Sequence, residues 1–222
     1  MLRWILERNE NQTKNLFMKK IIAALLISTP IVGFSQIGIK AGVNFANVTK
    51  VSDISNSNTA GFHAGLFLSP PAKGVMGYRT ELLFSQQGYN YKTGTNTGNV
   101  NLNYLILPQY MTINITKYFQ IQLGGQMAFL LNAKVDSSGN SNGNNPYGEI
   151  MDYYNKFDYG YGGGIEVHPI KGLLLGARVN ISLSSLYKDM GTSTPGTPPS
   201  FIPEVDVKNN LFQIFAGWQF GK

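Results

Sequence analysis

Apolar and polar residues alternate most clearly at the end of the chain, between Asn209 and Phe220. One set of alternate positions is wholly apolar: Phe212, Ile214, Ala216, Trp218 and Phe220. The other set includes Gln213 and Gln219. Because successive side chains of a β-strand point to opposite faces, the pattern predicts a strand with one apolar and one polar face.

The same alternation recurs along the rest of the chain after residue 36. It predicts further strands at 37–45, 60–68, 76–89, 100–114, 119–129, 152–167 and 173–183. A tilted strand crosses a bilayer with ~9–11 residues, so these runs are long enough to span one. Only the fourth run leaves its phase open, because Tyr104 to Leu107 contains apolar residues in succession.

The connections between these strands alternate in length. Long ones fall at 46–59, 90–99, 134–151 and 188–207, and short ones at 69–74, 115–118 and 168–171. Sorting of this kind is typical of outer-membrane barrels. We therefore expect an all-β domain over 36–222, an eight-stranded antiparallel up-and-down transmembrane β-barrel. Its last strand should pair with 37–45, so that no sheet edge stays open in the membrane.

Charge supports the barrel interpretation. Charged residues make up 14% of the chain, against about 25% in soluble domains. The charged strand residues share one face, and a lipid-facing Arg or Lys costs ~2–4 kcal/mol at the bilayer midplane. We expect a lumenal polar network, structural in role, to which glycines give room. Its expected members are Lys40, His63, Arg79, Glu81, Gln122, Asp158, Glu166, Arg178 and Gln213.

Aromatic residues concentrate near the ends of the predicted strands, as in the interfacial girdles of membrane barrels. The expected girdle residues are Tyr78, Phe84, Tyr89, Tyr104, Tyr110, Tyr118, Phe119, Phe157, Tyr159, Trp218 and Phe220. In the closing strand we expect Phe212, Ile214, Trp218 and Phe220 to face lipid.

The start of the chain has the pattern of a secretory signal peptide. Met18, Lys19 and Lys20 form a basic segment, 21–32 is apolar, and a cut is expected before Gln36. We expect residues 1–35 to be an upstream extension and signal, with Met18 as the true start. Five of 18 basic and two of 12 acidic residues lie there, so the remainder carries only +3 and nucleic-acid binding is not indicated.

Candidate chemistry is sparse. The chain has no cysteine, and no phosphate-binding or zinc-type spacing occurs, so we expect no cofactor and no metal. Some small outer-membrane barrels are enzymes that use a histidine with a serine and an acid. Here His168 lies in a short turn, while His63 could meet Ser85 and Glu81. We expect a hydrogen-bonded His63 in the lumen and a protein that is not an enzyme.

Several short segments resemble a known family, the small outer-membrane β-barrel proteins of Bacteroidetes, often labelled PorT-like. They are 37–44 (IGIKAGVN), 61–65 (GFHAG), 81–88 (ELLFSQQG) and 104–108 (YLILP). The sequence departs from that family at Ile106, where relatives often carry an acid, and in ending with Gly221 and Lys222 after Phe220. The resemblance implies a place in the outer membrane of a Gram-negative cell and says little about activity.

The function expected first is non-enzymatic: a structural, adhesive or envelope-assembly role. Its partners would be outer-membrane lipid and other envelope proteins, contacted through the external loops 46–59, 90–99, 134–151 and 188–207. We expect a monomer that binds no nucleic acid. The alternatives are an accessory component of a secretion system, a narrow ion pore, and a soluble lipocalin-like ligand binder. A lumen filled by side chains argues against a pore for anything larger than ions.

Overall fold

The computed structural model describes residues 36–48, 57–72, 74–93, 96–137, 151–188 and 208–221. The expected signal peptide therefore lies outside the described residues. The strands are β1 (Gln36–Val48), β2 (Ser57–Ser69), β3 (Met76–Thr93), β4 (Asn96–Asn114), β5 (Phe119–Ser137), β6 (Phe157–Val167), β7 (Leu173–Ser182) and β8 (Asn209–Gln219). One 3-10 turn, η1 (Met151–Tyr153), precedes β6.

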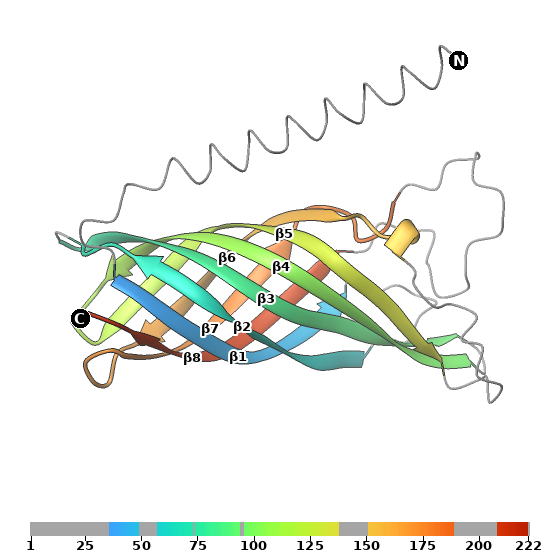
Figure 1. Cartoon of the computed structure of the whole chain (residues 1–222), viewed down its shortest axis with the longest axis horizontal. Coiled ribbons are helices and arrows are strands. Elements are labelled where there is room, and N and C mark those ends of the chain that lie inside the picture. Colours follow the sequence, from blue (N-terminus) through green and yellow to red (C-terminus); the bar gives the residue numbers. More distant parts are fainter. Residues whose placement is uncertain are drawn as a thin grey trace, which may run out of the picture. The chain divides into compact units, whose positions relative to one another are not determined.

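The strands form one closed antiparallel barrel in chain order, as the sequence predicts (Figure 1). β8 pairs with β1 and so closes it, with Ala216 opposite Ala41 and Trp218 opposite Ile39. Every strand is therefore hydrogen-bonded on both sides through the body of the barrel. A closed sheet leaves no unpaired backbone facing lipid, which is the condition for a β-structure to span a membrane.

The two ends of the barrel differ. The connections 70–75, 115–118 and 168–172 are short and lie at the same end, here called the short-turn end (Figure 1). The other end is the long-loop end. Within the described ranges, no helix is long and apolar enough to cross a membrane.

Three of the expected loops are shorter than the sequence indicated. Most of 90–99 is strand, because β3 runs to Thr93 and β4 starts at Asn96. β5 likewise continues to Ser137, and 46–48 and 57–59 belong to β1 and β2. In these extensions the residues are mostly polar, but the backbone hydrogen bonds between neighbouring strands continue, so the strands run further than the alternation of apolar residues indicates. The sixth strand starts at Phe157 rather than at 152, because η1 occupies 151–153.

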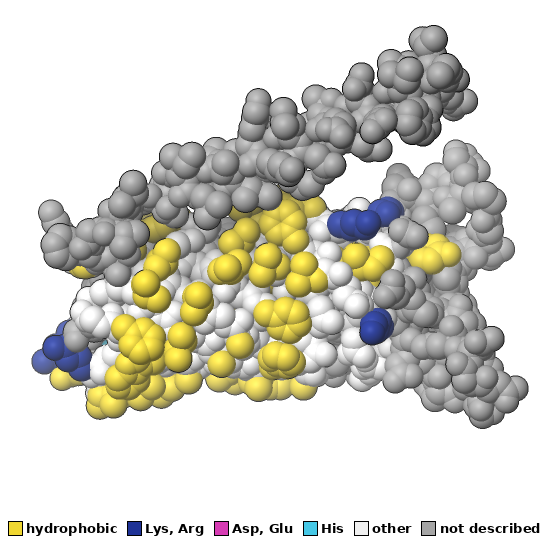
Figure 2. Space-filling model, in the orientation of Figure 1, with side chains coloured by type: hydrophobic (Ala, Val, Ile, Leu, Met, Phe, Trp, Pro, Cys, Tyr) yellow, Lys and Arg dark blue, Asp and Glu magenta, His cyan; other side chains and the backbone are white. Residues whose placement is uncertain are grey.

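The outside of the barrel is apolar along the strands (Figure 2). Of the closing strand, Phe212, Ile214, Trp218 and Phe220 are 41–49% exposed, and Gln213 on the opposite face is buried. Phenylalanines pair across neighbouring strands toward the long-loop end, with ring centroids 5.3–6.1 Å apart: Phe45–Phe212, Phe62–Phe84 and Phe129–Phe157. A girdle of this kind fits a bilayer interface.

The girdle assignment is wrong for three tyrosines. Tyr89, Tyr104 and Tyr110 are buried in the lumen, at 0–2% exposure. The phase of β4 explains this: Leu102, Tyr104 and Ile106 point inward, and Asn101 and Asn103 point outward. At this height, toward the long-loop end, the outer surface of the barrel carries polar residues such as Asn101 and Asn103. The apolar side chains of this part of β4 therefore pack inside the barrel.

Candidate functional site: the lumen

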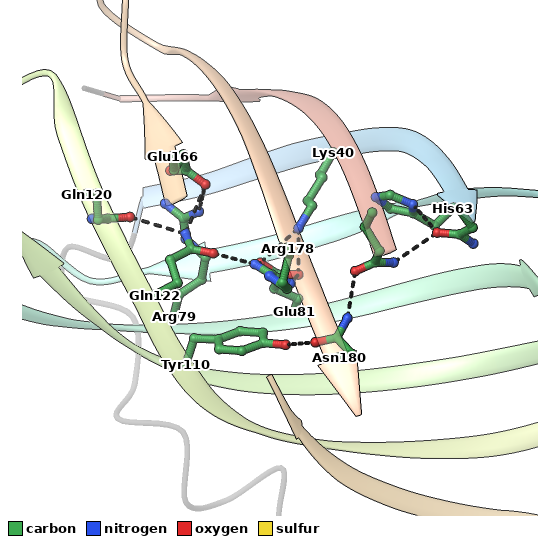
Figure 3. Close-up of polar contacts among 12 residues, drawn as sticks. Lys40, His63, Arg79, Glu81, Tyr110, Gln120, Gln122, Glu166, Arg178 and Asn180 are labelled. Atoms are coloured by element: carbon green, nitrogen blue, oxygen red, sulfur yellow. Dashed lines mark hydrogen bonds and ion pairs between the residues drawn. The ribbon is translucent and has the colours of Figure 1, made fainter. Parts of the chain in front are cut away.

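Glu81 is the centre of a charged cluster inside the barrel (Figure 3). Arg178 of β7 donates to both of its carboxylate oxygens, from Nη1 and Nη2, each at 2.9 Å. Lys40 of β1 reaches the same carboxylate, with Nζ 3.1 Å from Oε2. One anion on β3 thus holds two cations, one from β1 and one from β7, the two strands that flank β8. Two parallel hydrogen bonds make the arginine pair geometrically specific.

Glu166 is the second anion of the cluster. Its Oε2 accepts from Arg79 Nη1 at 2.5 Å and from Gln122 Nε2 at 2.9 Å. His168 Nε2 lies 3.0 Å from Oε1, so this turn histidine reaches back into the lumen. Gln122 Oε1 also accepts from Arg178 Nη2 at 2.5 Å. The amide of Gln122 thus connects Glu166 to Arg178, which in turn binds Glu81.

Aromatic rings and glycines lie around these charges. Lys40 Nζ lies 3.5 Å from the ring centroid of Phe215, and Arg178 Cζ lies 4.0 Å from that of Tyr110. Cations over ring faces are stabilised further, most of all when desolvated. Lys40 stands opposite glycines on both neighbouring strands, Gly65 and Gly217. A Cβ at Gly65 would overlap the backbone of Leu82, and one at Gly217 would overlap the backbone of Ile39 and the side chain of Leu174, so both positions are too close to their neighbours for a larger residue.

A chain of amide hydrogen bonds continues from this cluster toward the long-loop end. Tyr110 donates its hydroxyl to Asn180 Oδ1 at 2.6 Å, and Asn180 donates to Gln213 Oε1 at 3.0 Å. Gln213 donates to Asn44 Oδ1 at 3.0 Å, and His63 Nδ1 contacts the same oxygen at 2.7 Å. Because Asn44 Oδ1 is an acceptor, His63 carries its proton on Nδ1.

The structure brings together all the expected network residues except Asp158. Its carboxylate accepts hydrogen bonds from Ser182 and Ser184 instead. His63 stands opposite Ser85 across β2 and β3. Its Nδ1 partner is an asparagine rather than a carboxylate, and its Nε2 has no hydrogen-bond partner among the described residues.

Sequence reasoning missed several network members. They are Asn44, Tyr110, His168, Asn180 and Gln120, whose Oε1 accepts from Gln122 Nε2 at 3.2 Å. The signal was available for Asn44 and Asn180, which share their strand face with Lys40 and Arg178. Tyr110 could be placed only once the phase of β4 was known.

Tyrosines close the long-loop end. The hydroxyl of Tyr89 on β3 contacts those of Tyr154 and Tyr187, at 2.9 Å for Tyr154. Tyr154 and Tyr187 lie outside the strands and pair in an isolated bridge. Burial raises the pKa of both hydroxyls above the ordinary value for tyrosine, so both stay protonated. Around this tyrosine cluster pack Leu83, Val100, Leu102, Tyr104, Ile106, Ala128, Leu130, Ala133 and Leu186.

The lumen is therefore filled through its charged middle. Lys40, Arg79, Glu81, Glu166 and Arg178 are each 0–2% accessible to solvent. A water-filled passage beside these side chains would leave them measurably exposed. Three cations and two carboxylates are thus paired away from water. Among the described residues, no group of three or more potential metal ligands occurs.

A closed eight-stranded barrel with an apolar exterior and a packed polar lumen defines a small outer-membrane β-barrel protein. A model of the family "Outer membrane protein beta-barrel domain" matches residues 12–188. The chain belongs to this family. No curated protein matches the sequence.

Solved outer-membrane barrels have the same fold. Ail, the attachment invasion locus protein of Yersinia pestis, in complex with the heparin analogue sucrose octasulfate, is 16% identical with a TM-score of 0.50; the match covers 84% of this chain and 99% of Ail. OprG of Pseudomonas aeruginosa is 12% identical, with TM-score 0.46 and coverage of 85% and 97%. Outer Membrane Protein W of E. coli is 15% identical, with TM-score 0.41 and coverage of 86% and 100%. At these identities the likeness concerns the fold alone.

Proposed function

We propose that this protein is a sealed, non-enzymatic outer-membrane barrel that acts by surface contact at its long-loop end. The observation that carries the proposal is the burial of the charged cluster, whose ionic side chains are 0–2% exposed. A barrel with such a lumen offers solutes no route and offers a substrate no cleft in its middle. The parts left to act are the two ends.

The proposal includes export by a signal peptide and the closer kinship with PorT-like barrels of Bacteroidetes. Against the soluble lipocalin-like alternative stands the apolar exterior. Leu66, Leu123 and Val179 are 48–52% exposed on three different strands. A soluble protein rarely exposes apolar surface on this scale, whereas a lipid-facing belt requires it.

Cysteine labelling on intact cells tests the proposed location and orientation. The chain has no cysteine, so one introduced thiol is unique. Lys156, exposed toward the long-loop end, and Lys171, exposed in a short turn, form a matched pair for substitution. A membrane-impermeant maleimide should label Lys156→Cys on intact cells and Lys171→Cys only after lysis. Equal labelling of both before lysis would contradict the proposal.

A further inference from the structure

The outer wall of the barrel carries a polar patch inside its apolar belt. On β4, Gln109 faces outward between Leu107 and Met111, where the alternation otherwise places apolar side chains. Gln109 stands opposite Gly125 of β5. On the outer face of β5, three apolar residues precede Gly125 and three follow it: Phe119, Ile121, Leu123, Met127, Phe129 and Leu131. Gln109 therefore lies near the middle of the lipid-facing wall.

Two residues of β3 satisfy this amide only in part. The hydroxyl of Tyr78 donates to Gln109 Oε1, and Gln109 Nε2 donates to Thr80 Oγ1 at 2.5 Å. A primary amide can donate two hydrogen bonds and accept two. Within the described chain, one N–H and one acceptor position of Gln109 are therefore left over. Acyl chains offer neither a donor nor an acceptor, so these groups stay unpaired unless another protein reaches them.

The position beside Gln109 on β5 has no side chain. A Cβ placed at Gly125 would meet one atom within 4 Å, the carbonyl oxygen of Gly160 at 3.4 Å, so the lipid side of this glycine is open. The strands of two upright barrels cross at a large angle, because each set is tilted by about 35–45°, and two walls therefore touch over a short length. A small residue at that point lets the two backbones approach closely.

We propose that the patch formed by Tyr78, Thr80, Gln109 and Gly125 is the contact through which two copies of this chain pair side by side in the membrane. With a two-fold axis along the membrane normal, both copies keep the same orientation and the patch meets itself. The remaining N–H of each Gln109 then donates to the remaining acceptor position of the other. An amide is self-complementary in this way, whereas a lipid chain satisfies neither group. The pair replaces the monomer expected from the sequence and does not involve the long-loop end.

A second surface that would allow close approach lies on the opposite side of the barrel. Ala41 of β1 stands between Ala64 of β2 and Ala216 of β8, so three small residues are adjacent on the outer face. β1 lies four strands away from β5 in either direction around the closed sheet. The side chains of this alanine surface offer no hydrogen bond. It is therefore the matched control surface for the proposed contact.

Dimerisation in synthetic phospholipid bilayers tests the proposal. The protein has no cysteine, so a label at Lys171→Cys is unique, and pairs are counted by single-molecule photobleaching while the lipid-to-protein ratio is raised. The protein with Gln109 intact should pair, and the pairs should dissociate on dilution into lipid. Gln109→Met, which keeps the length of the side chain and removes the amide, should weaken pairing about tenfold. Val179→Met, on the outer face of β7, should leave pairing unchanged.

Added bulk tests the place of contact. Gly125→Leu should weaken pairing by about tenfold or more, because the new side chain holds the two walls apart. Ala41→Leu, on the control surface, should not weaken it. Heat-modifiable gel mobility checks that every variant is folded. The reverse order of effects would place the contact on β1 and overturn the proposal.

Mixed pairs test the reciprocal hydrogen bonds. When Gln109 is present in one copy and replaced by Met in the other, both bonds are lost, so the mixed pair should be as weak as the pair of variants. A mixed pair of intermediate strength, or pairing that ignores Gln109→Met, overturns the amide contact. Absence of pairs at every lipid ratio overturns the proposal as a whole. None of these results affects the labelling of Lys156→Cys, which tests the proposed function, so the two claims fail separately.

Discussion

Arg178 and Glu81, 97 residues apart in the chain, face each other across the lumen in a two-point ion pair with both nitrogen–oxygen distances 2.9 Å. Neither side chain is exposed. A buried pair of this kind contributes little over an apolar core of the same shape, but removing one partner leaves the other charge unpaired. The charged cluster should therefore be sensitive to single substitutions.

Glu81→Gln tests this sensitivity. It removes the anion shared by Arg178 and Lys40 and should lower the free energy of unfolding by about 3–5 kcal/mol. Urea unfolding in phospholipid vesicles, followed by gel mobility, measures the change. Asp158→Asn is the control, because Asp158 accepts hydrogen bonds from two serines and from the backbone of Tyr159 rather than from a cation, and should lose about 0.5–1.5 kcal/mol. Similar losses for both variants would contradict the account of the cluster.

Gly164→Ala tests the space around Arg178, which stands opposite it on β7. A Cβ at this glycine would overlap the backbone of Ala177 and Arg178, which cannot move without breaking the sheet. We expect a marked loss of folded protein, read as the heat-modifiable fraction. Gly125→Ala, on the outer face, meets its nearest atom at an ordinary 3.4 Å and should fold normally. Normal folding of both variants would show that β6 and β7 leave space for a side chain at position 164, against this account.

Tyr89→Phe tests the tyrosine cluster at the long-loop end. It removes the hydroxyl that joins Tyr154 and Tyr187 and leaves buried hydroxyls short of a partner, at a cost of about 1–3 kcal/mol. Hydrogen exchange should quicken at 151–156 and 183–188 while the body of the barrel stays protected. Tyr161→Phe, on the lipid-facing side, is the control. Unchanged exchange in the first variant would refute a closing role for the cluster.

Arginine substitutions on β8 test the position of the bilayer. Ile214→Arg should cost about 2–4 kcal/mol if this exposed residue lies near the midplane, and Asn210→Arg, toward the long-loop end, about 0–1 kcal/mol. Unfolding titrations in vesicles give both values. The membrane assignment would be in difficulty if the two costs were equal.

The alternation of residues was enough to predict the barrel, its closure and the faces of most strands. The closing strand shows why. Its apolar set is uninterrupted, so a shift of its pairing register by one residue would turn Gln213 from the lumen to the lipid. The fourth strand could not be assigned in the same way. Above the belt, Asn101 and Asn103 face outward and Leu102 and Tyr104 inward, so the apolar face changes side along one strand.

The lumenal network was predictable as a set of residues and not as a set of contacts. Charge on a common strand face identifies Lys40, Glu81 and Arg178 as lumenal. Which cation meets which anion depends on strand stagger around the barrel, which pairs Glu166 with Arg79 and leaves Asp158 to serines. The tyrosine cluster needs residues from outside the strands, where alternation gives no information.

Single-molecule conductance in planar bilayers tests the central claim, a lumen sealed by its own side chains. The wild-type protein, inserted at a density verified by gel mobility, should give no resolved current steps. Arg178→Ala removes a fully buried side chain from the middle of the barrel and is the variant most able to open a path. Discrete steps from the wild-type protein that change in size with Arg178→Ala would contradict the sealed barrel.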